Sequence, residues 1–266
     1  MRQKLDDLYE QYNRRAYVHP DPLEFLYFYE HVRDREIVGL IASSLAYGKV
    51  AQILKSVSRV LKIMGESPFD YLCSTPESEI LLHFDLFVHR FAKGKHLSAL
   101  LIGIKHIIAD YGSIYNCFVD GFSSSDDTIV PALTVFSQKI IASSDDCCPV
   151  NHPGHLMPCP DKGSACKRLN LYLRWMIRCD DVDPGGWPGI CASKLIVPLD
   201  THMFKISGQL GLTDRKQANL KTAIEITEGF KNWAPADPVC YDFALTRFGI
   251  RNDLAGNAGL VMKLGI

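Results

Sequence analysis

The sequence lacks an excess of charge of one sign and lacks any long apolar run. Its 29 Lys and Arg residues are balanced by 30 Asp and Glu residues, for a formal net charge of −1. A near-neutral chain has no global attraction for nucleic acid, so any such binding must come from a local patch. No apolar run approaches the roughly 20 residues that a membrane helix needs, and we expect no membrane contact.

The sequence also lacks the signs of an exported, disulfide-bonded protein. Its first segment, MRQKLDDLYEQYNRR, is charged throughout and has no apolar core of the kind found in a signal peptide. We therefore expect a cytoplasmic protein, associated with the nucleoid if it is prokaryotic. In that compartment the nine cysteines are expected to be free thiols rather than disulfides.

What is present is helical periodicity. Apolar residues recur at three- and four-residue steps over residues 36–64, and Gly48 interrupts them, which predicts two helices with a turn at 46–49. Further helices are predicted at 96–111, 129–143, 164–178, 202–210, 214–233 (capped by Thr213) and from Asp237 or Pro238 through Phe248. No period-two strand pattern and no internal repeat occur. The predicted fold class is all-α, in roughly ten helices.

The segment 145–162, DDCCPVNHPGHLMPCPDK, has four prolines, one glycine and no periodicity, which predicts a loop. Folds of helices that bind a substrate in a cleft often have two lobes, and this loop is the natural crossing. We therefore expect one unit of two helical lobes over residues 1–250, with the crossing at about 144–163. The glycine-rich segment 251–266 is expected to be a C-terminal tail.

Residues 163–202 contain the pair of side chains most relevant to chemistry. Lys167 opens a predicted helix after the turn GSAC, and Asp200 follows the apolar run 195–199 at the start of another helix. A helix N-terminus is electropositive, which is expected to lower the pKa of Lys167 toward the nucleophilic free amine. An amine and a carboxylate in these positions can carry out covalent chemistry on an electrophilic carbon.

Simpler interpretations of these residues stay open. The polar face of the Lys167 helix also carries Arg168, Arg174 and Arg178, and charges of this kind usually coat a solvated surface. Asp200 alone is explained as a helix N-cap. Tyr47 and Trp187 lie in glycine-containing turns and look exposed; such aromatics cover apolar patches or stack on nucleobases.

A metal site is another alternative, built from the loop at 147–166. This loop carries Cys147, Cys148, His152, His155, Cys159 and Cys166. Zinc sites favour ligands two to four residues apart, so the adjacent pair of cysteines is a poor chelate, and no CxxC occurs. A metal-dependent enzyme using this loop is the weaker alternative.

Three segments resemble the helix-hairpin-helix (HhH-GPD) DNA glycosylases, the group of endonuclease III and the 8-oxoguanine DNA glycosylases. GSACK resembles the hairpin and catalytic-lysine signature G-x-G-[ST]-K, VPLDTHMFKI resembles V-P-V-D-[TV]-H, and LIASSLAYGKVAQI resembles the early helix that carries the residue inserted into DNA. Across residues 36–250 the chain also resembles the uncharacterised DUF2400 family, whose GSACKRLN and KLIxPLDTH stretches are similar.

The resemblance implies an all-α protein of two lobes with a DNA- and base-binding cleft between them, acting as a monomer on damaged double-stranded DNA. It implies a bifunctional glycosylase and AP lyase, acting on an oxidised base such as 8-oxoguanine through a Lys167 Schiff base, with Asp200 stabilising the sugar cation. The implied DNA contacts are Gly163, Ser164, Ala165, Arg168, His202, Tyr47 and Lys49, and the implied base pocket contains Trp187 and Phe204. A DNA-binding protein of this fold without the reaction is the alternative.

The sequence departs from this pattern in three places. The second hairpin glycine is replaced by Ala165, which is expected to alter the approach of the backbone to a phosphate. Lys167 and Asp200 lie 33 positions apart, wider than in most of the superfamily, and the excess fits an insertion at 180–189. Only Cys240 lies beyond Asp200, so we expect no iron–sulfur cluster, no other cofactor and no metal.

Overall fold

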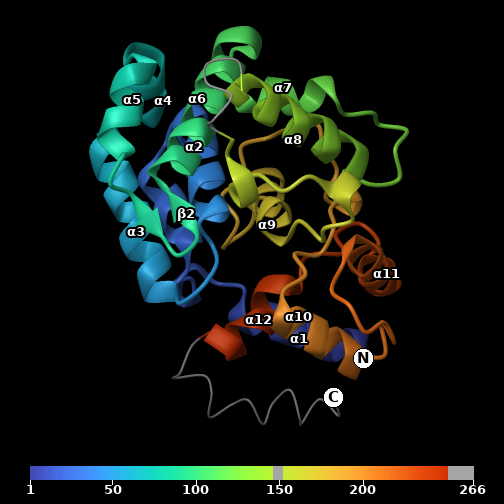
Figure 1. Ribbon diagram of the computed structural model, residues 1–266. Helices are drawn as coiled ribbons and strands as arrows, with labels where there is room; N and C mark the ends of the chain where they lie inside the picture. The colour runs from blue at the N-terminus through green and yellow to red at the C-terminus, as the bar shows by residue number, and fades with distance from the viewer. Residues whose placement is uncertain (146–151, 251–266) are drawn as a thin grey trace. The chain divides into compact units, whose positions relative to one another are not determined.

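The structure is a computed structural model that describes residues 1–145 and 152–250 (Figure 1). The predicted tail at 251–266 lies outside the described residues, as do Cys147 and Cys148 of the predicted cysteine and histidine loop.

The described residues are mostly helical, which confirms the all-α class. The twelve α-helices among them are α1 (Arg2–Tyr12), α2 (Val32–Ser44), α3 (Val50–Met64), α4 (Pro68–Ser74), α5 (Glu77–Phe84), α6 (Gly94–Tyr111), α7 (Ile114–Asp120), α8 (Val130–Asp145), α9 (Lys167–Ile177), α10 (Thr201–Gln209), α11 (Leu220–Lys231) and α12 (Asp242–Ile250). The five 3-10 helices are η1 (Arg15–Tyr17), η2 (Pro22–Phe28), η3 (Gly154–Leu156), η4 (Pro160–Lys162) and η5 (Ala192–Lys194).

One antiparallel hairpin interrupts the helices, formed by β1 (Val88–His89) and β2 (Ala92–Lys93). The sequence shows no period-two pattern at this hairpin. Strands of two residues are too short to show a period-two pattern in the sequence.

Several predicted boundaries are confirmed and two are wrong. The predicted turn at 46–49 separates α2 from α3. The helix expected at 214–233 begins only at Leu220, because Asn219 accepts the N–H of Thr222 at 3.1 Å and caps it. Thr213 instead accepts the N–H of Arg215 at 3.2 Å, which closes a local turn rather than a helix. The last helix begins at Asp242, not at Asp237 or Pro238.

The chain divides into two compact units. The terminal unit combines Met1–Pro20 with the chain from Lys162 onward, and the central unit is Asp21–Asp161. The central unit contains α2 to α8 with the hairpin, and the terminal unit contains α1 and α9 to α12.

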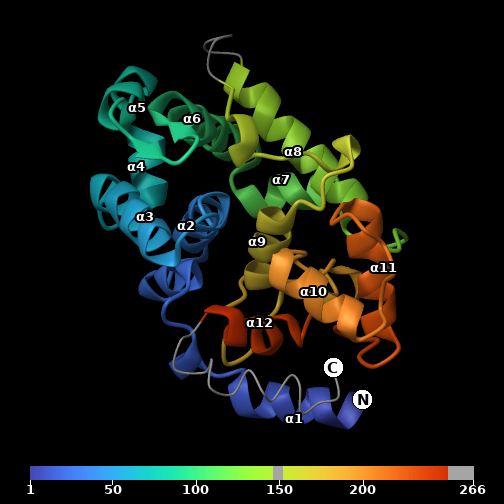
Figure 2. The same cartoon turned by 60° about the horizontal axis from the view of Figure 1, so that its bottom comes forward.

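The core of the central unit is built around α6, which packs against α4, α5, α7 and α8. Figures 1 and 2 show α6 and α8 side by side. Gly103 lets the two helices approach, because a Cβ there would lie 2.4 Å from Ser144 Oγ and 2.7 Å from the carbonyl oxygen of Ile140. The side chains of Leu97, Leu100, Leu101 and Ile104 are fully buried, so burial of apolar surface stabilises this packing.

The core of the terminal unit surrounds α9, whose Tyr172, Leu173 and Trp175 are buried. Helix α12 packs against both α1 and α10, and Figure 2 shows α12 (red) beside α10 (orange). This packing brings the starts of α10 and α12, each with an aspartate, into one helical cluster.

No single helix among the described residues is long and apolar enough to cross a bilayer. Helices α6 and α7 reach that length and hydropathy only as a pair, and this pair is bent by 73°.

Candidate functional site

The turn before α9 is held in a conformation that few residues adopt. Gly163 has φ +76° and Cys166 has φ +46°. The carbonyl oxygen of Gly163 accepts the N–H of Leu220 at 3.0 Å, and Ser164 pairs with Asn219 in an isolated antiparallel bridge. These contacts join the start of α9 to the start of α11. The sequence GSAC thus forms a tight, anchored turn, in the place where the hairpin was predicted.

Ala165 fits this turn without strain. Among the described residues that are not glycine, only Arg90 and Cys166 have positive φ, so the backbone at Ala165 does not require glycine. Its side chain is 7% exposed, and its carbonyl oxygen accepts the Asn170 Nδ2 amide at 2.9 Å. The replacement of the second hairpin glycine therefore leaves the turn conformation accessible to this sequence.

Lys167 is the first residue of α9, as predicted. Its side chain and that of Arg168 are half-buried, whereas Gly163 and Ser164 are exposed. The first N–H groups of a helix have no acceptor within the helix and carry a partial positive charge. An exposed turn leading into such a helix start can receive an anion.

The rest of the polar face of α9 is buried, so the interpretation of this face as a solvated surface is wrong. The side chains of Arg174 and Arg178 are each 3% exposed. Arg174 pairs with Asp183 and Asp242, and Arg178 pairs with Asp180, Asp183 and Asp237. A guanidinium group that is buried away from water needs carboxylate partners, and the terminal unit provides four aspartate carboxylates for these two arginines.

Asp200 lies at the start of α10 after five buried residues at 195–199. Its Oδ1 accepts the N–H groups of His202 at 2.9 Å and Met203 at 2.8 Å, so the N-cap interpretation is confirmed. Both hydrogen bonds go to the same oxygen. The side chain is half-buried, and a capping role does not occupy its second oxygen.

Asp242 is the residue that connects Lys167 with Asp200. It is the first residue of α12, is 4% exposed, and pairs with Arg174. Burial raises the pKa of its carboxyl to about 6 even though Arg174 opposes this; the charge of Asp200 raises the pKa further and that of Lys167 lowers it. The predicted lysine and the predicted aspartate therefore both lie within electrostatic range of one buried carboxyl.

Sequence reasoning missed Asp242. The signal was weak: an aspartate directly before the apolar residues Phe243, Ala244 and Leu245, which reads as an ordinary helix start. Only the ion pair with Arg174, 68 positions earlier in the chain, distinguishes it from a capping residue.

The insertion at 180–189 contributes Val182, Asp183 and Trp187 to the buried residues of the terminal unit. Asp180 accepts the N–H groups of Val182 and Asp183, each at 2.8 Å, which closes a tight turn. Tyr9 of α1 donates its hydroxyl to Asp180 at 3.0 Å. Burial works against the ionised form of Asp180, but Arg178 and the two N–H donors outweigh it and hold the pKa of this carboxyl below its usual range.

The expectation that Trp187 is exposed is wrong. The side chain is 2% exposed, and its ring meets the ring of Tyr172 edge-on with centroids 5.2 Å apart. The backbone N–H of Trp187 donates to the carbonyl oxygen of Met176 at 2.9 Å. Trp187 thus fixes the insertion against α9. By contrast, His202 in the first turn of α10 is exposed, and Phe204 is half-buried.

Tyr47 lies in the central unit and is half-buried rather than exposed. Its hydroxyl donates to the carbonyl oxygen of His89 at 2.9 Å, so it must accept from His155 Nε2, which lies 2.9 Å away. His89 Nε2 donates back to the carbonyl oxygen of Tyr47 at 3.2 Å. Lys49, two residues further on, is exposed and precedes α3.

A family model described as "Protein of unknown function (DUF2400)" matches residues 21–251. The chain belongs to the DUF2400 family. No curated protein and no solved structure matches it.

The cysteine and histidine loop is only partly within the described residues, since Cys147 and Cys148 lie outside them. Within the part of this DUF2400 protein that the structure describes, no group of three or more His, Cys, Asp or Glu side chains is arranged to hold a metal ion. Cys159 and Cys166 are buried, and neither forms a disulfide.

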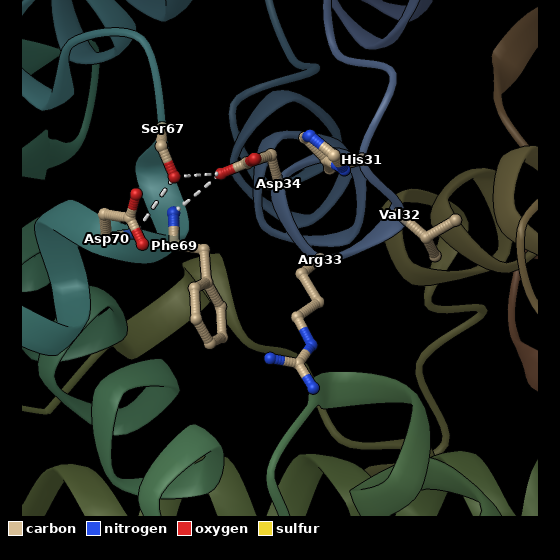
Figure 3. Close-up of a pocket in the computed structure, with 7 residues that line it drawn as sticks. All are labelled: His31, Val32, Arg33, Asp34, Ser67, Phe69 and Asp70. Carbon is tan, nitrogen blue, oxygen red and sulfur yellow. Dashed lines mark hydrogen bonds between the residues drawn. The ribbon is translucent and has the colours of Figure 1, made fainter.

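The central unit also has a surface pocket of about 420 Å³, which none of the predicted site residues lines. Figure 3 shows Asp34 pointing at Ser67 and at the N–H of Phe69, and both donate to it at 2.9 Å. Ser67 in turn accepts the N–H of Asp70 at 3.1 Å, and the guanidinium of Arg33 lies 5.1 Å from the ring centroid of Phe69. These polar groups satisfy one another, so the pocket is explained by the joining of α2 to α4.

Proposed function

We propose that this DUF2400 protein is an HhH-GPD DNA glycosylase with AP lyase activity, acting on an oxidised base such as 8-oxoguanine in double-stranded DNA. The observation that carries the proposal is the arrangement around Asp242. Lys167 and Asp200, the two residues that the motifs mark as catalytic, begin separate helices and both act on this one buried carboxyl. The DNA-binding cleft implied by the motifs is part of the same proposal.

The reaction uses an amine and two carboxylates. The Nζ lone pair of Lys167 forms a bond to C1′ of the sugar while the N-glycosidic bond breaks. The base leaves with the electron pair of the glycosidic bond and takes up a proton. Asp200 stabilises the positive charge that develops on the sugar. Opening of the sugar ring then gives a Schiff base, and elimination of the 3′ phosphate nicks the strand.

Asp242 holds the proton that the ammonium of Lys167 gives up before attack. An ordinary aspartate is too weak a base for this near neutral pH, whereas a carboxyl with a pKa of about 6 is matched to it. Its pairing with Arg174 fixes its position. Asp242 therefore enters the proposal as the proton acceptor, a role that the sequence motifs do not include.

The DNA contacts in the terminal unit follow from exposure and charge. The N–H groups of the turn at Gly163 and Ser164 receive a phosphate, assisted by Arg168. His202 is exposed in the first turn of α10, and Phe204 follows Asp200 by one helical turn and offers an aromatic wall for the extruded base. Trp187 is left out of this base pocket because it is 2% exposed.

Borohydride trapping tests the proposal. The protein is incubated with oligonucleotides carrying 8-oxoguanine, uracil, thymine glycol or an abasic site, and borohydride is added to reduce any Schiff base to a stable adduct. We expect an adduct with at least one lesion for the natural sequence and none for Lys167→Gln. Lys162→Gln, which removes an exposed lysine five positions earlier, is the matched control and should trap normally.

Two outcomes contradict the proposal. Trapping that persists in Lys167→Gln means that another amine is the nucleophile. Binding to duplex DNA with no adduct on any lesion means that the protein is a DNA-binding protein of this fold without the lyase reaction.

A further inference from the structure

Cationic side chains from separate segments gather on one face of the central unit. They come from the hairpin, from the start of α6 and from the turn that carries His155. We call this the histidine face, and it consists of Arg90, Phe91, Lys93, Lys95, His96 and His155.

Ring contacts hold the segments together. His155 donates to the hydroxyl of Tyr47 at 2.9 Å, its ring centroid lies 6.2 Å from that of His96, and the ring of Phe91 lies 6.4 Å away. His96 is itself fixed, because its Nδ1 accepts the N–H of Lys93 at 3.0 Å. The face is therefore built by the fold and not by chance proximity of flexible side chains.

Arg90 is placed on this face by a strained backbone. Its φ of +52° is rare for a residue other than glycine. Its side chain occupies the space of a Cβ at Gly48, which would lie 2.7 Å from Arg90 Cδ. The guanidinium lies 5.4 Å from the ring centroid of Phe91, and that ring is 71% exposed. Strained residues of this kind persist where function requires a particular direction of the side chain.

Among the residues that the structure describes, no carboxylate forms an ion pair with Arg90, Lys93 or Lys95. Burial lowers the pKa of His96 below its ordinary value, and Lys95, Lys93 and His152 lower it further. The groups that face His96 are thus Lys93, Lys95, His152 and His155, all cationic or able to become so.

We propose that the histidine face binds the phosphate backbone of a nucleic acid and that His96 takes up a proton as it binds. An exposed aromatic ring among cations favours a polynucleotide, because phosphates pair with the cations while a base stacks on Phe91. The neighbouring cations destabilise the imidazolium form of His96 in the unbound protein. A phosphate bound beside His96 stabilises that form. The identification of the nucleic acid as DNA rests on the proposed function; the anion-binding chemistry of the face does not.

Because proton uptake is coupled to binding of the nucleic acid, the direction of the pH effect on affinity follows. The His96 imidazole is neutral in the unbound protein at pH 8 and becomes protonated in the complex, so affinity increases as pH falls. If one proton is taken up over part of the range from pH 8 to pH 6, affinity for a labelled oligonucleotide should rise about tenfold across that range. Fluorescence anisotropy at constant ionic strength measures this affinity. Calorimetry in two buffers with different ionisation enthalpies counts the protons.

Two double variants test the face. His96→Asn with His155→Gln keeps the acceptor for Lys93 and the donor for Tyr47 but removes both imidazoles. Its affinity should not increase between pH 8 and pH 6, whereas that of the natural protein should. Lys93→Gln with Lys95→Gln should bind weakly at both pH values and reduce the slope of log affinity against log salt by about 2. The controls are His31→Gln and Lys62→Gln, which alter exposed residues of the same unit outside the face.

The proposal is overturned if the histidine variant keeps its pH dependence, or if the lysine variant binds oligonucleotides like Lys62→Gln. Binding to anionic phosphatidylserine vesicles without binding to oligonucleotides also overturns it. These outcomes are independent of borohydride trapping at Lys167. A protein that traps normally but shows no effect of the face variants retains the proposed function and loses this inference.

Discussion

Arg174 of α9 forms a buried ion pair with Asp242 of α12, and each residue is less than 5% exposed. The pair joins two helices that are far apart in the sequence. It also positions the Asp242 carboxyl, whose pKa is affected by the charges of both Lys167 and Asp200. The structural core and the proposed site of the terminal unit therefore share one side chain, Asp242.

Replacing Asp242 by Asn tests its titration. Because the pKa of Asp242 is raised from 3.8 to about 6 in the folded protein, the folded state binds more protons than the unfolded state in this range. Stability from this group is present below about pH 4 and is lost as pH rises to about 6, by roughly 3 kcal/mol at 1.36 kcal/mol per pKa unit.

Urea unfolding of the natural protein and Asp242→Asn at pH 4, 5, 6 and 7 measures this effect. The free energy of unfolding of the natural protein should fall relative to that of the variant as pH rises through this window. A difference that is constant with pH shows that Asp242 does not titrate there. In the borohydride assay the same variant should trap more slowly while retaining DNA binding.

Two variants of Asp200 separate capping from catalysis. Asn caps helices about as well as Asp, so Asp200→Asn should change stability by less than about 0.5 kcal/mol, while Asp200→Ala should lose about 1 kcal/mol. Both variants lack the carboxylate and should lose adduct formation. Thermal unfolding and trapping on the same samples make the comparison. If Asp200→Asn traps normally, Asp200 is only the N-cap of α10.

Gly163 and Gly208 should respond to alanine in opposite directions. A Cβ meets nothing within 4 Å at either position, but only Gly163 has a positive φ, +76°. Gly163→Ala should lose about 1–2 kcal/mol through backbone strain alone, whereas Gly208→Ala, within α10, should gain about 0.5–1 kcal/mol. Denaturant titration of both measures this, and equal effects would show that φ at Gly163 is not the constraint.

Arg178 should be among the residues that matter most for stability. It pairs with Asp180, Asp183 and Asp237 and is 3% exposed on its side chain. Arg178→Ala removes one of the two cations paired with the buried Asp183 and leaves the partly exposed Asp180 and Asp237 without this partner, and it should cost about 3–5 kcal/mol. Lys162→Ala, at an exposed position, is the control and should cost less than about 0.5 kcal/mol. Similar urea midpoints for the two variants would contradict the importance of this network.

Much of the fold could be predicted because its signals are local. The break between α2 and α3 follows from Gly48, which interrupts the three- and four-residue spacing of apolar residues. Helix α6 follows from a spacing of this kind that is not interrupted. The start of α11 could not be predicted. Thr213 and Asn219 are both good N-caps, and the bridge between Ser164 and Asn219 favours the later start.

The all-α class, the turn that leads into Lys167 and the helix start at Asp200 follow from local sequence, because caps, glycines and periodicity act over a few residues. Which charges are buried depends on how the helices pack. This packing placed Arg174 and Arg178 among carboxylates, moved Trp187 from an expected surface into the core, and joined Lys167, Asp200 and Asp242 electrostatically. These relationships join positions tens of residues apart, and burial, which local sequence does not encode, sets their energies.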